Sequence, residues 1–117
     1  TVGRDHYGEN KVVFYDAVYF FQKLRQMGKQ PEIVAMCHKL LGPVLRYDEE
    51  HKTQLTDTFR CLLVNNENVK KTAEQLFIHK NTVLQRKNKL TELFGYSPFD
   101  MPYRLNFLMI FDIMEKK

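Results

Sequence analysis

Cysteine is scarce in this sequence, and it lacks the motifs of a metal or nucleotide site. Cys37 and Cys61 have no CxxC spacing, which fits a reduced protein better than a disulfide framework. The four histidines are scattered and form no ligand set of the zinc type. The five glycines form neither a P-loop nor a GxGxxG turn, and no nucleophile motif is recognisable. We therefore expect no cofactor, no bound metal, no catalytic residue and no enzymatic activity.

Long hydrophobic runs are also absent. No apolar stretch approaches the roughly 20 residues that span a bilayer. The first ten residues, TVGRDHYGEN, lack the apolar segment of a signal peptide. We therefore expect a cytoplasmic protein with no membrane partner. Because the sequence does not start with Met, we also expect it to be a piece cut from a longer chain.

The residues that are present favour a packed helical domain with a basic second half. Apolar residues make up 44% of the 117 residues, and nine Phe and six Tyr supply much of the bulk for a core. The net charge is +4, which alone is weak evidence for an anionic partner. The distribution is more informative, because the stretch 79–89 contains cations and no acid. These cations are Lys80, Arg86, Lys87 and Lys89.

Apolar residues recur at helical spacing along most of the chain, which predicts an all-α fold, a compact bundle of about six short helices. The expected helices cover 17–27, 31–41, 53–64, 69–76, 79–94 and 103–114, with a further short segment over 44–51. We expect Gly42 and Pro43 to break the chain between two of them. Asp16 and Thr53 are the expected N-caps of the helices that follow them, and Gly95 is the expected left-handed stop after Phe94.

The N-terminal segment is harder to interpret. Val12 to Tyr15 is the only β-branched and aromatic run that could form a strand. The aromatic residues that follow are expected to lie in the core, although their density on several faces is also typical of a surface that a missing domain would cover. They are Phe14, Tyr15, Tyr19, Phe20 and Phe21.

The segment from Asn68 to Phe94 has the anatomy of a helix-turn-helix. Ala73 lies midway along the first helix, where a small residue lets two helices cross closely. Leu76 and Ile78 flank the turn and are expected to point into the core, and Val83 is expected to pack back against the first helix. Such a motif presents its second helix to the major groove of DNA.

The second helix of this motif has two distinct faces. At 100° per residue, Val83, Leu90 and Phe94 cluster on one side, and the opposite side carries Asn81, Gln85, Asn88 and Glu92. Amides can pair with adenine edges, so Asn81, Gln85 and also Lys80 are predicted to read bases. The remaining predicted site residues would hold phosphates or orient the helix. They are Thr72, His79, Thr82, Arg86 and Lys89. The helix N-terminus at 79–81 is also expected to favour an anion.

The stretch from Leu40 onward, with LLGPVLRYDEE, TAEQLFIHKNTVLQRKNKL and TELFG, resembles the C-terminal helix-turn-helix domain of PucR-like and CdaR-like (sugar diacid regulator) bacterial transcription factors. The most specific part of the resemblance is HKNT at 79–82 followed by Arg86. Two positions depart from the usual pattern: Gln85 stands where an aromatic is usual, and Lys87 where Leu is usual. The resemblance implies a ligand-responsive transcriptional activator, and it makes Val12 to Tyr15 the last strand of an upstream regulatory domain.

We therefore expect residues 1–15 to be a stub of an upstream domain or a disordered tail, and residues 16–117 to form a DNA-binding domain with the motif at 68–94. The expected partners are double-stranded DNA, a second copy in the full-length protein, and a small-molecule effector bound by an upstream domain that this sequence lacks. Two alternatives stay open. One is a protein-interaction module that reuses the helix-turn-helix fold without binding DNA. The other is a small all-α enzyme or ligand sensor, which would require a deep pocket with converging titratable groups.

Overall fold

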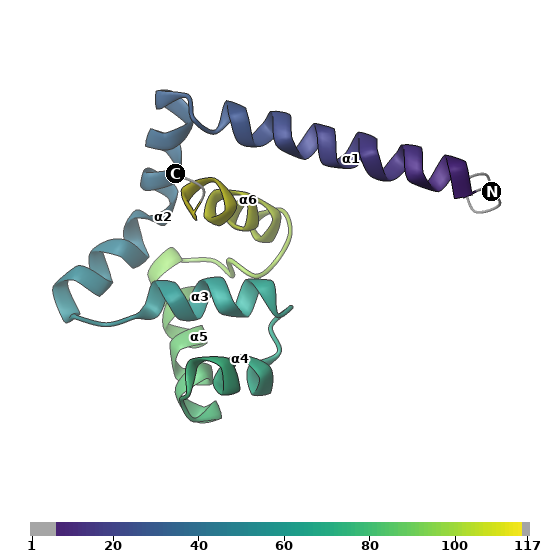
Figure 1. Cartoon of the computed structure of the whole chain (residues 1–117). Helices are drawn as coiled ribbons and strands as arrows, with labels where there is room; N and C mark the ends of the chain where they lie inside the picture. Colours follow the sequence, from purple (N-terminus) through teal and green to yellow (C-terminus); the bar gives the residue numbers. More distant parts are fainter. Residues whose placement is uncertain (1–6, 116–117) are drawn as a thin grey trace. The chain divides into compact units, whose positions relative to one another are not determined.

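The computed structural model describes the backbone of residues 7–115 and the side chains of residues 14–115. This part of the chain contains six α-helices and no strand (Figure 1). The helices are α1 (Tyr7–Met27), α2 (Pro31–His51), α3 (Leu55–Val64), α4 (Val69–Leu76), α5 (Lys80–Phe94) and α6 (Tyr103–Glu115). The predicted all-α class is thereby confirmed.

The chain divides into two compact units, residues 1–35 and 36–117, and the boundary falls inside α2. The first unit contains α1 and the first turn of α2. Val12 to Tyr15 lie inside α1, so the predicted strand is wrong, and Asp16 is an interior residue of the helix rather than its cap. A single short run has no partner strand to pair with, whereas the flanking residues continue a helical pattern. The predicted division at residue 15 stays a prediction, and residues 1–6 lie outside the described part.

The aromatic side chains of α1 were expected to form core, and that expectation is wrong. The aromatic residues at 14, 15, 19, 20 and 21 are all exposed. They occupy consecutive or nearly consecutive positions, so they point in several directions around the helix and one neighbouring element cannot cover them all.

The helix α2 continues through Gly42 and Pro43, so the predicted break is wrong. Proline removes one intrahelical hydrogen bond but leaves the rest of the ladder in place. Leu41 and Val44, on either side of the pair, are buried in the core of the second unit, and this packing offsets the lost bond. Gly42 is itself buried, and a Cβ at this position would approach the Arg46 guanidinium to 2.7 Å.

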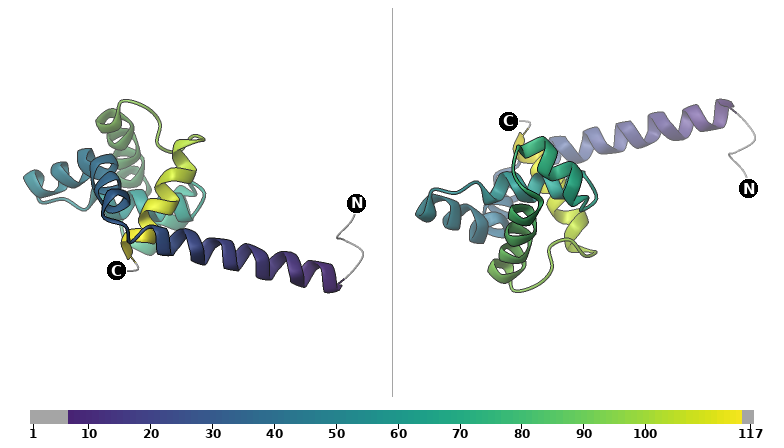
Figure 2. Two further views of the ribbon diagram at one scale, coloured as in Figure 1. Left: turned by 90° about the horizontal axis from the view of Figure 1, so that it is seen from above. Right: turned by 90° about the horizontal axis from the view of Figure 1, so that it is seen from below.

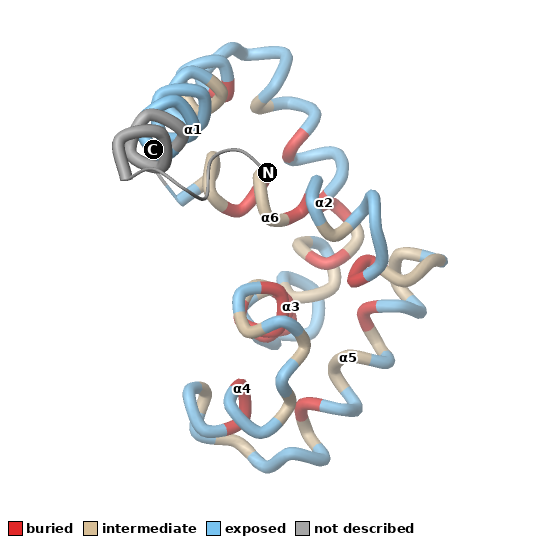
Figure 3. Tube along the Cα trace, turned by 90° about the vertical axis from the view of Figure 1, so that its right-hand side faces the viewer, coloured by how far each residue is buried: buried red, intermediate tan, exposed pale blue. Residues whose placement is uncertain are grey.

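The core of the second unit is built around α3, which packs against α4, α5 and α6 (Figure 2). Colouring by burial shows the densest run of buried residues along α3, whereas α5 has few (Figure 3). Phe59 is fully buried at the centre. Four phenylalanine rings surround it at centroid distances of 5.0 to 5.5 Å. They are Phe94, Phe99, Phe107 and Phe111. This aromatic cluster fixes α5 and α6 on α3.

The first turn of α3 is capped by a residue that lies earlier in the chain than expected. The predicted N-cap, Thr53, does not cap the helix; instead its hydroxyl donates to the Asp48 carboxylate at 2.6 Å. The same carboxylate accepts from the backbone N–H groups of Leu55 and Thr56, each at 2.8 Å, and from the Thr56 hydroxyl. Burial alone would raise the pKa of Asp48, but these hydrogen bonds outweigh burial and lower it.

Candidate nucleic-acid interface

The helices α4 and α5 form the predicted helix-turn-helix, and local capping defines each of their ends. The Asn68 side chain accepts from the Lys71 N–H at 2.9 Å at the start of α4. Phe77 ends α4 in the left-handed conformation, at φ 58°. The His79 ring accepts from the Asn81 N–H at 3.0 Å and starts α5, and Gly95 ends it at φ 80°, as predicted. We had expected the N–H groups at 79–81 to be open to an anion. The Asn81 N–H is not open, because it donates to the His79 ring.

Packing of the motif agrees with the sequence pattern in most positions. Ala73 and Val83 are buried in one core cluster, and Ile78 packs against it from the turn. Leu76 is only half-buried, so its predicted place in the core is wrong in part. The motif is therefore held through one face of α4 and one face of α5.

The outward face of α5 carries the residues that the helical wheel assigned to it. Asn81, Gln85, Asn88 and Glu92 are all exposed, whereas Val83 and Leu90 are fully buried. Lys80 is exposed at the first position of the helix and pairs with no acid of the described residues. Thr82 is half-buried on the shoulder of this face. We call the exposed residues of α5 from Lys80 to Glu92 the outward face.

Two predicted contact residues face inward instead. Thr72 is fully buried, and its hydroxyl accepts from the Asn65 side-chain amide at 3.2 Å, so this side chain does not lie on the exposed surface. Arg86 is half-buried, and its guanidinium donates to the hydroxyl of the fully buried Thr58 at 2.9 Å. The sequence predicted that these residues hold phosphates or orient the helix. The inward positions of Thr72 and Arg86 suit the second role.

Lysines 87 and 89 are both engaged within the protein. The Lys87 ammonium pairs with Glu67 at 2.9 Å and lies 5.5 Å from the centre of the Phe99 ring, so its stem crosses the core edge while its charge is paired. This arrangement explains how a lysine fits on the buried side of α5 near Val83. Lys89 pairs with Glu92 at 3.0 Å, and the hydrogen bond from this neighbour raises the pKa of Lys89.

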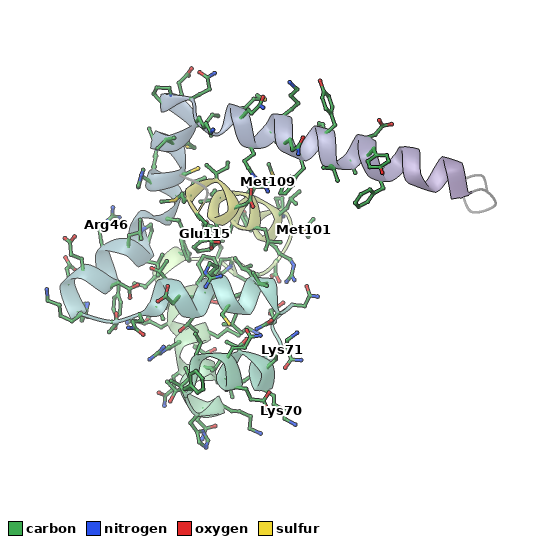
Figure 4. All side chains as sticks on the ribbon, in the orientation of Figure 1. Arg46, Lys70, Lys71, Met101, Met109 and Glu115 are labelled. Carbon is green, nitrogen blue, oxygen red and sulfur yellow. The ribbon has the colours of Figure 1, made fainter. Side chains whose placement is uncertain are left out.

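Several surface residues of the motif were not predicted from the sequence. Lys70 and Lys71 are exposed at the start of α4 and point outward from it (Figure 4). Phe77 is 93% exposed in the turn, and Leu84 is 45% exposed on the outward face. An open groove of about 500 Å³ runs between the two helices. Its lining residues are Lys70, Ala73, Glu74, Phe77, Ile78, His79 and Lys80. The two adjacent lysines before Thr72 could have been recognised in the sequence as candidate phosphate contacts. No periodic pattern predicts an exposed Phe or Leu.

Comparison with known proteins identifies the family of this motif. The family described as the PucR C-terminal helix-turn-helix domain matches residues 55–113, which is half of the chain and includes α3, α4 and α5. The chain belongs to the PucR family. The proline-responsive transcriptional activator PutR of Bacillus subtilis (strain 168) is 31% identical over 109 residues, or 93% of this chain. The chain spans 26% of the length of PutR. No solved structure matches.

Membership of the PucR family confirms the resemblance read from HKNT and Arg86, and it makes the chain the helix-turn-helix part of a transcriptional regulator. Between residues 7 and 115 no helix combines the length and apolarity that crossing a bilayer requires. Among the side chains of residues 14–115, no three His, Cys, Asp or Glu cluster as a metal site. In the motif of this PucR-family chain the exposed cations are Lys70, Lys71 and Lys80. The exposed acids are Glu74 and Glu92, and Glu92 is already paired with Lys89.

Proposed function

We propose that this chain binds duplex DNA sequence-specifically, with α5 as the recognition helix in the major groove. The observation that carries the proposal is the division of α5 into a buried apolar side and an exposed side of amides. Asn81 and Gln85 offer paired donors and acceptors that match the adenine edge. Lys80 at the start of the helix adds a mobile cation for a base edge or a phosphate.

The first helix of the motif supports the same docking. In helix-turn-helix complexes this helix crosses the DNA backbone while the second enters the groove. Lys70 and Lys71 stand exposed at the start of α4, where cations can pair with phosphates. His79, whose Nδ1 accepts a backbone N–H, carries the proton of its neutral ring on Nε2 and can donate it to a phosphate oxygen.

The test begins with selection of bound duplexes from a random pool by the chain, followed by titrations at several salt concentrations. Gln85→Ala is expected to relax specificity at one base pair by about 1–3 kcal/mol, because one amide pair is lost. Lys70→Ala is expected to lower the affinity for all duplex sequences alike. It should also reduce the slope of log K against log salt by about 0.9, the value for one phosphate contact. Lys89→Ala is expected to act in the same direction, to a smaller extent because its charge is already paired with Glu92.

Lys39→Ala is the matched control, because Lys39 is an exposed lysine on α2 outside the motif. It should change neither the slope nor the sequence preference. Duplex affinity that does not depend on salt, or equal specificity of the parent and Gln85→Ala, would contradict the assigned roles.

The whole protein is proposed to be a cytoplasmic, ligand-responsive regulator of bacterial transcription that acts as a homodimer. The support is the similarity to PutR, a proline-responsive transcriptional activator, and the 26% share of PutR that this chain spans. A helix-turn-helix also commonly binds two half-sites as a pair. Sedimentation of the full-length protein with and without an operator containing two half-sites tests the pairing.

A second candidate, a protein-interaction module, is favoured by one observation. The side chains of Phe14, Tyr15, Tyr19 and Phe20 in α1 are exposed, and exposed aromatic clusters are typical of interaction surfaces. Failure of the chain to bind any duplex would favour this candidate.

A further inference from the structure

One apolar side chain stands among the amides of the outward face. Leu84 is 45% exposed in the middle of α5. On a helix, residues three and four positions away lie beside it, and these are Lys80, Asn81, Lys87 and Asn88. All are exposed except Lys87, which is half-buried and paired with Glu67. Leu84 is therefore flanked by polar groups among the described residues of α5.

The outward face also lacks the group best suited to guanine. Arginine and lysine pair with guanine through its O6 and N7 atoms, and Arg is the geometrically stronger of the two. The helix α5 contains one arginine, Arg86, and its guanidinium is turned inward to the Thr58 hydroxyl. Over the first three turns of the helix, the groups left on this face are the amides of Asn81, Gln85 and Asn88, with Leu84 on the shoulder beside them.

These groups complement the two halves of a single kind of base pair. In the major groove an amide pairs with the N6 and N7 atoms of adenine, and an apolar side chain contacts the 5-methyl group of thymine. Both features belong to an A·T pair and neither to a G·C pair. An exposed Leu surrounded by Asn and Gln thus matches a surface that alternates polar edges with methyl groups.

We propose that Leu84 is a specificity-determining residue that packs on a thymine 5-methyl group, and that the centre of the outward face reads A·T base pairs. The inference rests on the proposed DNA binding and names the substrate class of that site: duplexes whose half-site has A·T pairs beneath Leu84 and its amide neighbours. Lys80, at the N-terminal edge of the face, is left for the flanking base or phosphate.

The test uses the highest-affinity duplex from the random-pool selection. Each thymine in its half-site is replaced, one at a time, by deoxyuridine, which removes only the methyl group. For the parent chain we expect one replacement to weaken binding about fourfold, the factor for one methyl group returned to water. For Leu84→Ala the same replacement should have no effect, because the side chain that covers the methyl group is gone. Leu84→Met should retain sensitivity to the replacement.

Leu105→Ala is the matched control, since Leu105 on α6 is 49% exposed and lies outside the motif. It should bind the thymine and uracil duplexes as the parent does. Alanine is a good helix former at an exposed site, so Leu84→Ala should keep its fold, and circular dichroism checks this.

The outcomes separate the two proposals. If the chain binds no duplex in a salt-dependent manner, the proposed function fails and this inference falls with it. If the chain binds DNA but selection returns G·C pairs at the half-site centre, or no uracil replacement matters, DNA binding stands and the inference is wrong. If one uracil replacement weakens DNA binding by the parent and by Leu84→Ala equally, a group other than Leu84 contacts the methyl group, and the role of Leu84 is overturned.

Discussion

The hydrogen bond between Arg86 and Thr58 offers a direct measure of how the recognition helix is held. The guanidinium of Arg86 on α5 donates to the Thr58 hydroxyl on α3 at 2.9 Å, and Thr58 is fully buried. Hydrogen bonds to charged groups contribute about 1.5–3 kcal/mol. Arg86 is half-buried and can turn to water, and the Thr58 hydroxyl keeps a second partner in the Gln54 carbonyl at 3.3 Å. We therefore expect a value near the lower limit.

The assay is a double-mutant cycle of Arg86→Ala and Thr58→Val, with the free energy of unfolding of the four proteins measured in urea. We expect each single change to cost about 1.5–2 kcal/mol and the coupling between them to be about 1.5 kcal/mol. Lys80→Ala is the control and should shift stability by less than about 0.5 kcal/mol, as exposed sites do. Costs that simply add, within about 0.3–0.5 kcal/mol, would refute an orienting role for Arg86.

Two further predictions concern the caps of the motif and of α3. Asp48→Ala should lower the free energy of unfolding by about 1–2 kcal/mol at pH 7, because Leu55 and Thr56 lose their acceptor. Since folding lowers the pKa of Asp48, its contribution is complete above the ordinary carboxyl pKa of about 3.9 and is lost as pH falls through the lower folded value. Urea titrations should therefore show a smaller difference in the free energy of unfolding between the parent and Asp48→Ala at pH 3 than at pH 7. An equal difference at both pH values would argue against this role of Asp48. Phe77→Asn should raise thermal stability by about 1 kcal/mol, because Asn tolerates the left-handed conformation and the exposed ring makes few contacts to lose; a lower midpoint would contradict this.

The motif itself could be predicted closely from the sequence because its determinants are local. The spacing of Val83 and Leu90 fixes which side of α5 is buried, and Gly95 fixes where the helix ends. The outward position of Asn81 and Gln85 follows from the same spacing. Helical periodicity decides these features within one or two turns, and no distant contact overrides it.

The errors arose where distant residues decide the outcome. Thr53 has the usual composition of an N-cap, but Asp48 reaches the same N–H groups with a charged acceptor. The sequence of α5 left the role of Arg86 open between holding phosphates and orienting the helix, because its partner Thr58 lies 28 residues earlier in the chain. Gly42 is a usual helix breaker, yet burial of the residues around it keeps α2 continuous. The spacing of residues along the chain cannot predict such contacts between distant residues.

The carboxylate of Glu67 serves two helices at once. It accepts Lys87 of α5 at 2.9 Å and Arg104 of α6 at 3.5 Å, and Arg104 also donates to Asn66 in the same turn. A change at this one turn residue would thus remove one ion pair from α5 and one from α6 together, while the aromatic cluster around Phe59 still holds both helices on α3. The short connection ahead of α4 thus links α5 to α6 through a carboxylate that belongs to neither helix.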